Sequence, residues 1–188
     1  VDINAFTDDE YSDLMALFNL VWFDPVYKND YVELRKLFKK KKGYTLEDRY
    51  RIIDIQRDII RKIIPAYRKY VQEGKIEVTT SPYYHPIVPI LLDIKGIKIE
   101  DRSGLPADLK MPLDAKMQID MARKRIEELI GITPKGIWPS EHCVSGKELD
   151  LFKEMGFEWT ISDEGILANS INLEFVRDFK GYVEEPYH

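Results

Sequence analysis

Two kinds of hydrophobic pattern divide the chain. Over residues 8–74, apolar side chains recur every three or four positions, which is the spacing of one face of an α-helix. After Gly74, short runs of β-branched and apolar residues alternate with helical patterns and are separated by proline and glycine. The pattern therefore predicts a helical region over residues 1–74, packed as an insertion beside an α/β region over residues 75–188.

Three helices are expected in the first region. Acidic residues 8–10 suit the positive end of a helix dipole. A second, short helix is expected near residues 31–40. The third begins at a capping box of Thr45 with Asp48 and continues toward Gly74, with Pro65 expected to kink it or mark a junction between two helices. The apolar positions of the first helix are Leu14, Leu17, Phe18 and Val21.

The second region predicts strands that alternate with helices. One helix is expected to be capped by Asp114 and to end at Gly131, and another to open at a capping box of Ser145 with Glu148 and stop at Gly156. Strands linked through helices in this way form right-handed crossovers, so the prediction is a parallel sheet or barrel. The expected strands are residues 75–80, 135–138 and 157–162.

Polar loops rich in aromatic residues follow all three predicted strands. In parallel α/β folds the loops at the carboxyl ends of the strands build the functional site. Carboxylates beside aromatic rings suit sugar chemistry, because glycosidases use two carboxyl groups and sugar rings stack on aromatic faces. On the residues alone, Asp163 is the obvious second carboxylate for Glu141, although a helix cap is an equally open role for it. The candidate site residues are His85, Tyr83, Tyr84, Trp138, Glu141 and Asp163.

Composition narrows the classes of partner. The chain has 28 Lys and Arg against 33 Asp and Glu, a net charge of -5, so it offers no electrostatic footprint for nucleic acid or an anionic membrane. Cys143 is the single cysteine, which excludes an internal disulfide and a cysteine-based zinc site. No apolar run spans a membrane, and the chain opens without a signal peptide, which suggests a cytoplasmic location if nothing precedes it. The initial Val and the open C-terminal end suggest a piece of a longer chain.

Three segments carry a resemblance to a known family. They are GKIEVTTSPYYHPIVPIL (residues 74–91), GIWPSEHCVS (136–145) and WTISDEGIL (159–167). Together they resemble successive signature regions of glycoside hydrolase family 57, closest to its amylopullulanase and α-amylase branch. The connecting stretch over residues 106–134 is also similar to that family, so the resemblance covers residues 74–167.

The resemblance implies part of an incomplete (β/α)7 barrel that acts on α-glucans such as starch, amylose and pullulan with retention of configuration, without a cofactor or metal. It assigns Glu141 as the nucleophile, His85 and Trp138 to the substrate subsites, and Asp163 to a substrate-contacting position; Tyr83 and Tyr84 are expected as aromatic platforms. The family's opening His-Gln-Pro and its DGE-type segment with the general acid are both absent from the sequence. The chain is therefore expected to be the middle of an enzyme, inactive without the remainder of its parent chain.

Two other classes stay open. A metal-dependent polysaccharide deacetylase would need His85, His142 and Asp163 to converge on one ion. A non-catalytic glucan-binding domain would keep the tyrosine and tryptophan platforms without a working carboxylate pair.

Overall fold

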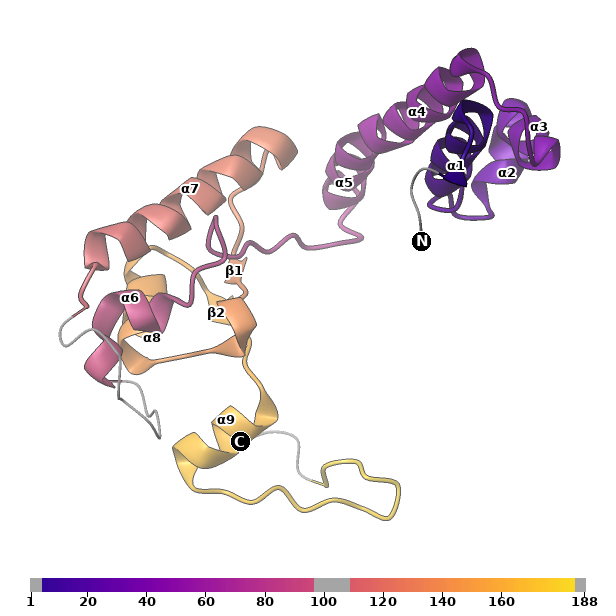
Figure 1. Ribbon diagram of the computed structural model, residues 1–188. Helices are drawn as coiled ribbons and strands as arrows, with labels where there is room; N and C mark the ends of the chain where they lie inside the picture. The colour runs from indigo at the N-terminus through magenta and orange to yellow at the C-terminus, as the bar shows by residue number, and fades with distance from the viewer. Residues whose placement is uncertain (1–4, 97–108, 185–188) are drawn as a thin grey trace. The chain divides into compact units, whose positions relative to one another are not determined.

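The computed structural model describes residues 5–96 and 109–184 of the chain (Figure 1). The chain divides into two compact units, Val1–Tyr67 and Arg68–His188, which are described separately below as unit 1 and unit 2. The domain boundary placed after Gly74 on sequence pattern stays a prediction.

Unit 1 is helical, and its helix ends follow local sequence signals. Thr7 caps the first helix in a capping box with Glu10, and Thr45 forms the predicted capping box with Asp48. The helices are α1 (Asp8–Leu20), α2 (Tyr27–Asp30), α3 (Val32–Lys40), α4 (Leu46–Arg61) and α5 (Ile63–Gln72), the last of which continues into unit 2.

The predicted junction near Pro65 is confirmed. Helix α4 ends at Arg61 and α5 begins at Ile63. Pro65 has no N–H to donate to the carbonyl four residues earlier, which belongs to Arg61, so the helical hydrogen-bond ladder is interrupted there.

Helix α1 uses the face opposite to the predicted one for its core contacts. Ala16 and Leu20 are buried against Ile52 and Ile55 of α4. The expected apolar positions Leu14, Leu17, Phe18 and Val21 are all exposed. Because α1 carries apolar residues on all sides, their spacing alone could not show which face packs against the core. The face that contacts α4 is the one with the small side chain of Ala16.

Unit 2 contains a small parallel sheet. Strand β1 (Gly136–Ile137) pairs with β2 (Trp159–Thr160), with Gly136 opposite Trp159. On the other side of β1, Thr80 forms a parallel bridge with Ile137. The Thr80 N–H donates to the Gly136 carbonyl at 3.2 Å, and the Trp138 N–H donates to the Thr80 carbonyl at 2.7 Å. The spatial order is therefore Thr80, β1, β2, with all carboxyl ends at one edge.

The strands are shorter than predicted. Of residues 75–80 only Thr80 pairs, and the other two strands keep two residues each. Proline supplies a physical reason, because it cannot donate to a ladder. Pro134 and Pro139 bracket β1, and Pro82 follows Thr80 closely. The α/β class is confirmed, with a sheet of this limited size.

Helices connect the three parallel segments, and one further helix follows the last segment. They are α6 (Val88–Asp93), α7 (Pro112–Ile130), α8 (Gly146–Glu154) and α9 (Glu164–Ile171), with 3₁₀ turns η2 (Ile94–Gly96) and η3 (Ser140–His142). Helix α7 ends at Gly131 in the left-handed conformation, as predicted. Its predicted start was wrong: it opens at Pro112 with Met111 as cap, because proline is pre-set for the first helical position, and Asp114 lies inside the first turn.

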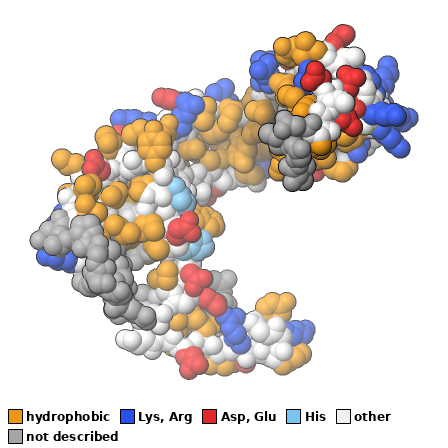
Figure 2. Space-filling model, viewed as in Figure 1, with side chains coloured by type: hydrophobic (Ala, Val, Ile, Leu, Met, Phe, Trp, Pro, Cys, Tyr) orange, Lys and Arg blue, Asp and Glu red, His pale blue; other side chains and the backbone are white. Residues whose placement is uncertain are grey.

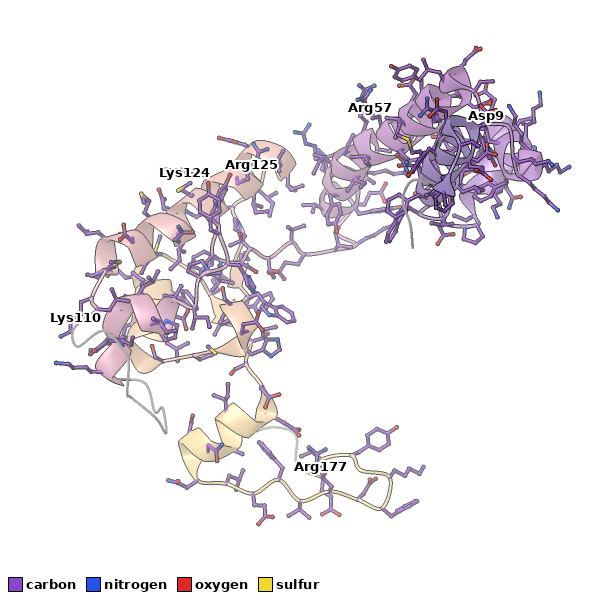
Figure 3. All side chains as sticks on the ribbon, in the orientation of Figure 1. Asp9, Arg57, Lys110, Lys124, Arg125 and Arg177 are labelled. Carbon is purple, nitrogen blue, oxygen red and sulfur yellow. The ribbon has the colours of Figure 1, made fainter. Side chains whose placement is uncertain are left out.

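The core of unit 2 packs α7 and α8 against β1. Ile119, Ile137, Phe152 and Phe157 form this cluster. Figure 3 shows Lys124 and Arg125 on α7, and both side chains are exposed. Within the described ranges, no helix has the length and apolar character needed to cross a membrane.

A tryptophan fastens the three parallel segments together. The Trp159 ring lies so close to Gly136 that a Cβ there would be 2.4 Å from ring carbons. Its Nε1–H donates to Glu77 Oε1 at 2.9 Å, on the segment that leads to Thr80. Gly136 is thus required by close approach, and one side chain reaches from β2 across β1 to the neighbouring segment.

Candidate active site

Two turns of the same design follow the paired positions Thr80 and Ile137. Each has proline two residues later and histidine five residues later, giving Pro82 to His85 and Pro139 to His142. In both turns the histidine N–H donates to the proline carbonyl, at 2.9 Å for His85 and 3.1 Å for His142. Both prolines are fully buried, so the two turns are anchored at equal height on neighbouring segments. We call them the His85 turn (82–85) and the Glu141 turn (139–142).

The two turns bring His85 and Glu141 together. His85 Nε2 lies 3.3 Å from Glu141 Oε1. Both side chains are open to solvent, with 54% and 69% of their surface exposed, so the carboxylate can be reached by a ligand. Figure 2 shows both described histidines on one face beside acidic side chains. An imidazole that carries its proton on Nε2 donates a hydrogen bond to the carboxylate and so orients it.

The backbone at this pair is left-handed. His85, Glu141 and His142 have φ values of 56°, 56° and 55°. Residues other than glycine adopt this backbone conformation at a cost of roughly 1 kcal/mol or more each. Such strained residues concentrate at functional sites, because the surrounding structure holds side chains in directions that a relaxed turn would not give.

Tertiary hydrogen bonds hold both turns, through residues that the sequence reasoning missed. Gln118 of α7 accepts from the Tyr84 N–H at 2.9 Å through Oε1 and from the Tyr83 N–H at 3.1 Å through its carbonyl. The Ser162 hydroxyl donates to the His142 carbonyl at 3.3 Å. One signal in the sequence could have pointed to Gln118. It is a polar residue on the face of α7 that also carries the buried residues Ala115 and Ile119.

Aromatic side chains lie on the two turns and beside them. Tyr84 is 74% exposed, and its ring lies edge-on to that of Tyr83 with centroids 4.8 Å apart. Trp138 packs edge-on against the His142 ring at 5.0 Å. All four rings belong to the two turns or adjoin them, and Tyr83, Tyr84 and Trp138 keep exposed surface for a ligand.

Asp163 has a structural task in the described chain. It is the N-cap of α9, and its Oδ1 accepts from the Gly165 N–H at 2.7 Å. The structure gives it no hydrogen bond to Glu141 or His85. A substrate contact by Asp163 remains a prediction.

The second predicted capping box is only half formed. The Ser145 hydroxyl accepts from the Glu148 N–H, but the Glu148 side chain turns into the core of unit 2, where it is fully buried. Neither Glu148 carboxyl oxygen has a hydrogen-bond partner among the described residues. Burial raises the pKa of Glu148 to about 8, and a backbone interaction at Ser145 offsets this only in part. Ser140, next to Glu141, is also buried with an unpartnered hydroxyl.

An ion pair joins the helices that follow the two turns. Lys147 of α8 pairs with Asp93 of α6 and holds the pKa of the Asp93 carboxyl below its ordinary value. The pair sits on a surface already fixed by packing of α6 against α8.

The convergence required by the deacetylase alternative is absent from the described part of the chain. No group of three or more His, Cys, Asp or Glu side chains is placed there to hold one metal ion. His85, His142 and Asp163 therefore do not form a ligand set in this structure.

Comparison with known proteins identifies the family. Residues 3–185 match the model of glycosyl hydrolase family 57, which is nearly the whole chain and includes both units. No curated protein and no solved structure matches the chain. The match agrees with the resemblance carried by the segments around His85, Glu141 and Asp163. The chain belongs to glycosyl hydrolase family 57.

Proposed function

We propose that the chain is the central part of a retaining glycoside hydrolase or transglycosylase of the amylopullulanase and α-amylase branch, acting on α-glucans such as starch, amylose and pullulan. Family membership gives the coarser statement, a glycoside hydrolase acting on glucans. The finer proposal is supported by one observation: an exposed carboxylate, Glu141, hydrogen-bonded to His85 at the carboxyl edge of a parallel sheet.

In this proposal Glu141 is the nucleophile. Its ionised carboxylate attacks the anomeric carbon and forms a covalent glycosyl-enzyme, while a second carboxyl group protonates the departing glycosidic oxygen. Water or a second sugar hydroxyl then displaces Glu141 with the same group acting as base. His85 keeps the carboxylate oriented, and Tyr83, Tyr84 and Trp138 offer faces on which sugar rings stack.

The proposal places the second carboxyl group outside the 188 residues. The DGE-type segment that carries it in the family does not occur in the sequence. The incomplete (β/α)7 barrel likewise needs further strands beyond the three parallel segments seen here. The proposed chain therefore carries half of a cleft and binds substrate without turning it over.

The direct test is Glu141→Ala in the full-length parent enzyme. Loss of the nucleophile should abolish α-glucan cleavage, and azide should partly restore it by occupying the vacated space as a small anion. Glu158→Ala is the matched control, because Glu158 pairs with Lys135 at the opposite edge of the sheet and should be dispensable. Unchanged activity in Glu141→Ala would sink the assignment.

The 188-residue chain tests the second part. Assayed on amylose and pullulan it should show no turnover, since general acid catalysis typically contributes about 10²- to 10⁴-fold. A titration with maltohexaose should still show weak binding that is lost in Tyr84→Ala. Turnover equal to that of a full-length enzyme would place the acid within the chain, with Asp163 the first residue to test.

A further inference from the structure

Helix α7 accepts hydrogen bonds from two adjacent backbone amides of the His85 turn. The Tyr84 N–H donates to the Gln118 side-chain oxygen at 2.9 Å, and the Tyr83 N–H donates to the Gln118 main-chain carbonyl at 3.1 Å. The turn satisfies only its third amide internally, through the bond from His85 to Pro82. One residue of α7 thus supplies the acceptors for the other two.

The position of Gln118 on α7 fixes these two hydrogen-bond acceptors in place. It lies half-buried on the stripe of α7 that includes Ala115, Ile119 and Ala122, all buried. Ile119 is part of the core cluster that also contains Ile137 of β1. The acceptor for the His85 turn is therefore tied to the same core that carries the strand leading to Glu141.

We propose that Gln118 is a positioning residue for the catalytic pair. It touches neither Glu141 nor the reacting atoms. By holding the Tyr83 and Tyr84 amides it fixes the left-handed His85 at the height where its Nε2 meets Glu141 Oε1. The inference rests on the proposed function for its catalytic consequence, while the hydrogen bond itself can be tested in the isolated chain.

The contrast with the Glu141 turn supports this role. That turn closes on itself, with the Cys143 N–H donating to the Ser140 carbonyl. Among the described residues, the side-chain hydrogen bond from outside to its backbone is the longer one from the Ser162 hydroxyl, at 3.3 Å. The His85 turn has no second internal bond of this kind, since the next residue is Pro86 and proline has no N–H. Its geometry consequently depends on α7.

The first test is amide hydrogen exchange at Tyr84 in the 188-residue chain, followed by NMR. Gln118→Met removes the acceptor and keeps the side-chain length, and should speed exchange about 5- to 10-fold, the value of one hydrogen bond. Gln118→Asn, whose amide falls short of Tyr84, should do the same. Gln118→Glu keeps an acceptor oxygen and should leave the rate unchanged.

Gln56→Met is the matched control. Gln56 makes a comparable long-range bond, from its Nε2 to the Asn19 carbonyl, within unit 1. It should leave Tyr84 exchange unaltered. Unchanged Tyr84 exchange in both Gln118→Met and Gln118→Asn would overturn the proposal.

The second test is a double-mutant cycle in the full-length parent enzyme. Gln118→Met should lower kcat about 10-fold because the reacting pair is misplaced, and should also raise KM, because the Tyr83 and Tyr84 rings belong to the same turn. In a His85→Ala background the same change should have almost no further effect, and Gln118→Glu should restore kcat. Additive losses would show that Gln118 acts independently of His85, and would overturn the positioning role.

The two tests separate the underlying assumptions. If Glu141→Ala retains activity, the proposed nucleophile is wrong, yet the exchange experiment still decides whether Gln118 holds the turn. If exchange responds and the cycle is additive, the hydrogen bond exists but does not act through His85, and the positioning role is overturned.

Discussion

The two units differ in what they bury. The core of unit 1 is built from apolar residues of α1, α3 and α4 together with Phe23 and Tyr44. The buried polar or charged residues of the described chain are Thr80, Ser140 and Glu148, and all of them belong to unit 2. Strained backbone follows the same division, since Lys41 is the one non-glycine residue with positive φ in the described part of unit 1, whereas unit 2 has His85, Glu141, His142 and Asn172.

This difference separates scaffold from site. Buried unpaired polar groups and non-glycine residues with a left-handed backbone both lower the stability of the fold. They persist where the fold must hold functional side chains in particular positions. In unit 2 these costs lie in or near the segments that carry His85 and Glu141, except for Asn172 at the end of α9. Unit 1 has few such residues, and regular helix capping and packing stabilise it. Unit 2 should therefore be the part whose stability responds most to substitution and to pH.

The largest expected effect is the removal of the buried ionisable carboxyl group of Glu148. Its pKa of about 8 in the folded chain exceeds the ordinary value of 4.5, so the folded state holds the proton more tightly than the unfolded state. The stability of unit 2 should therefore fall as pH rises, by about 1.4 kcal/mol per pH unit between those two values. Glu148→Gln should abolish this slope and be clearly more stable at pH 8.

Hydrogen exchange of peptides from α8, measured from pH 5 to pH 8 with correction for intrinsic rates, would report this slope. Peptides from α4 in unit 1 should not respond to the variant. The exposed Glu158→Gln serves as control. Parallel pH profiles for wild type and Glu148→Gln would contradict the interpretation.

A smaller loss is expected at the crossing of Gly136 and Trp159. Gly136→Ala places a Cβ within 2.4 Å of the Trp159 ring, and overpacking of this kind costs about 1 to 3 kcal/mol. The ring should be displaced from Glu77, which a change in tryptophan fluorescence would report. Gly146→Ala, with open space around it, should leave both fluorescence and stability nearly unchanged.

Unit 1 should respond to the loss of a helix cap. Thr45→Ala removes the hydroxyl that accepts from the Asp48 N–H and should destabilise α4 by about 1 kcal/mol. Thr45→Ser keeps the hydroxyl and should retain most of the stability. Chemical denaturation followed by circular dichroism at 222 nm provides the measurement, and equal midpoints for the two variants would show that the cap is energetically silent.

The smallest effect is expected at Cys143. It follows the Glu141 turn, yet its contribution to that turn is its main-chain N–H, which serine also has. Cys143→Ser in the parent enzyme should retain activity on amylose. A loss of more than about tenfold would assign the thiol a part in the chemistry.

Local signals in the sequence were enough where a neighbour along the chain decides the structure. The Thr45 capping box, the break before Pro65 and the stop at Gly131 all depend on residues within one helical turn. The packing side of α1 and the short strands depend on distant segments, which periodicity does not encode. Glu148 shows how local and distant signals can disagree. Its local sequence pattern predicts a capping box, but its side chain is buried in the core of unit 2.

The candidate site divides in the same way. Loops after parallel strands pointed to His85 and Glu141 as neighbours, and the structure brings them within 3.3 Å. Gln118 and Ser162 escaped the sequence reasoning because their roles arise only when α7 and the segment after β2 meet the two turns. Residues that make contact through tertiary hydrogen bonds leave little trace in a single sequence.

The equal spacing of the two turns makes the site intolerant of insertions and deletions. Surface loops usually accept a change of length, but His85 and His142 are each five residues beyond a position in the same bridge, Thr80 and Ile137. One residue added between Thr80 and Pro82 would advance that turn by about 3.3 Å and rotate its side chains to the other face. Chain length over these few residues is thus as much a part of the site as the identity of the side chains, and recombination of related sequences within residues 80–85 or 137–142 should yield active enzymes only when both lengths are preserved.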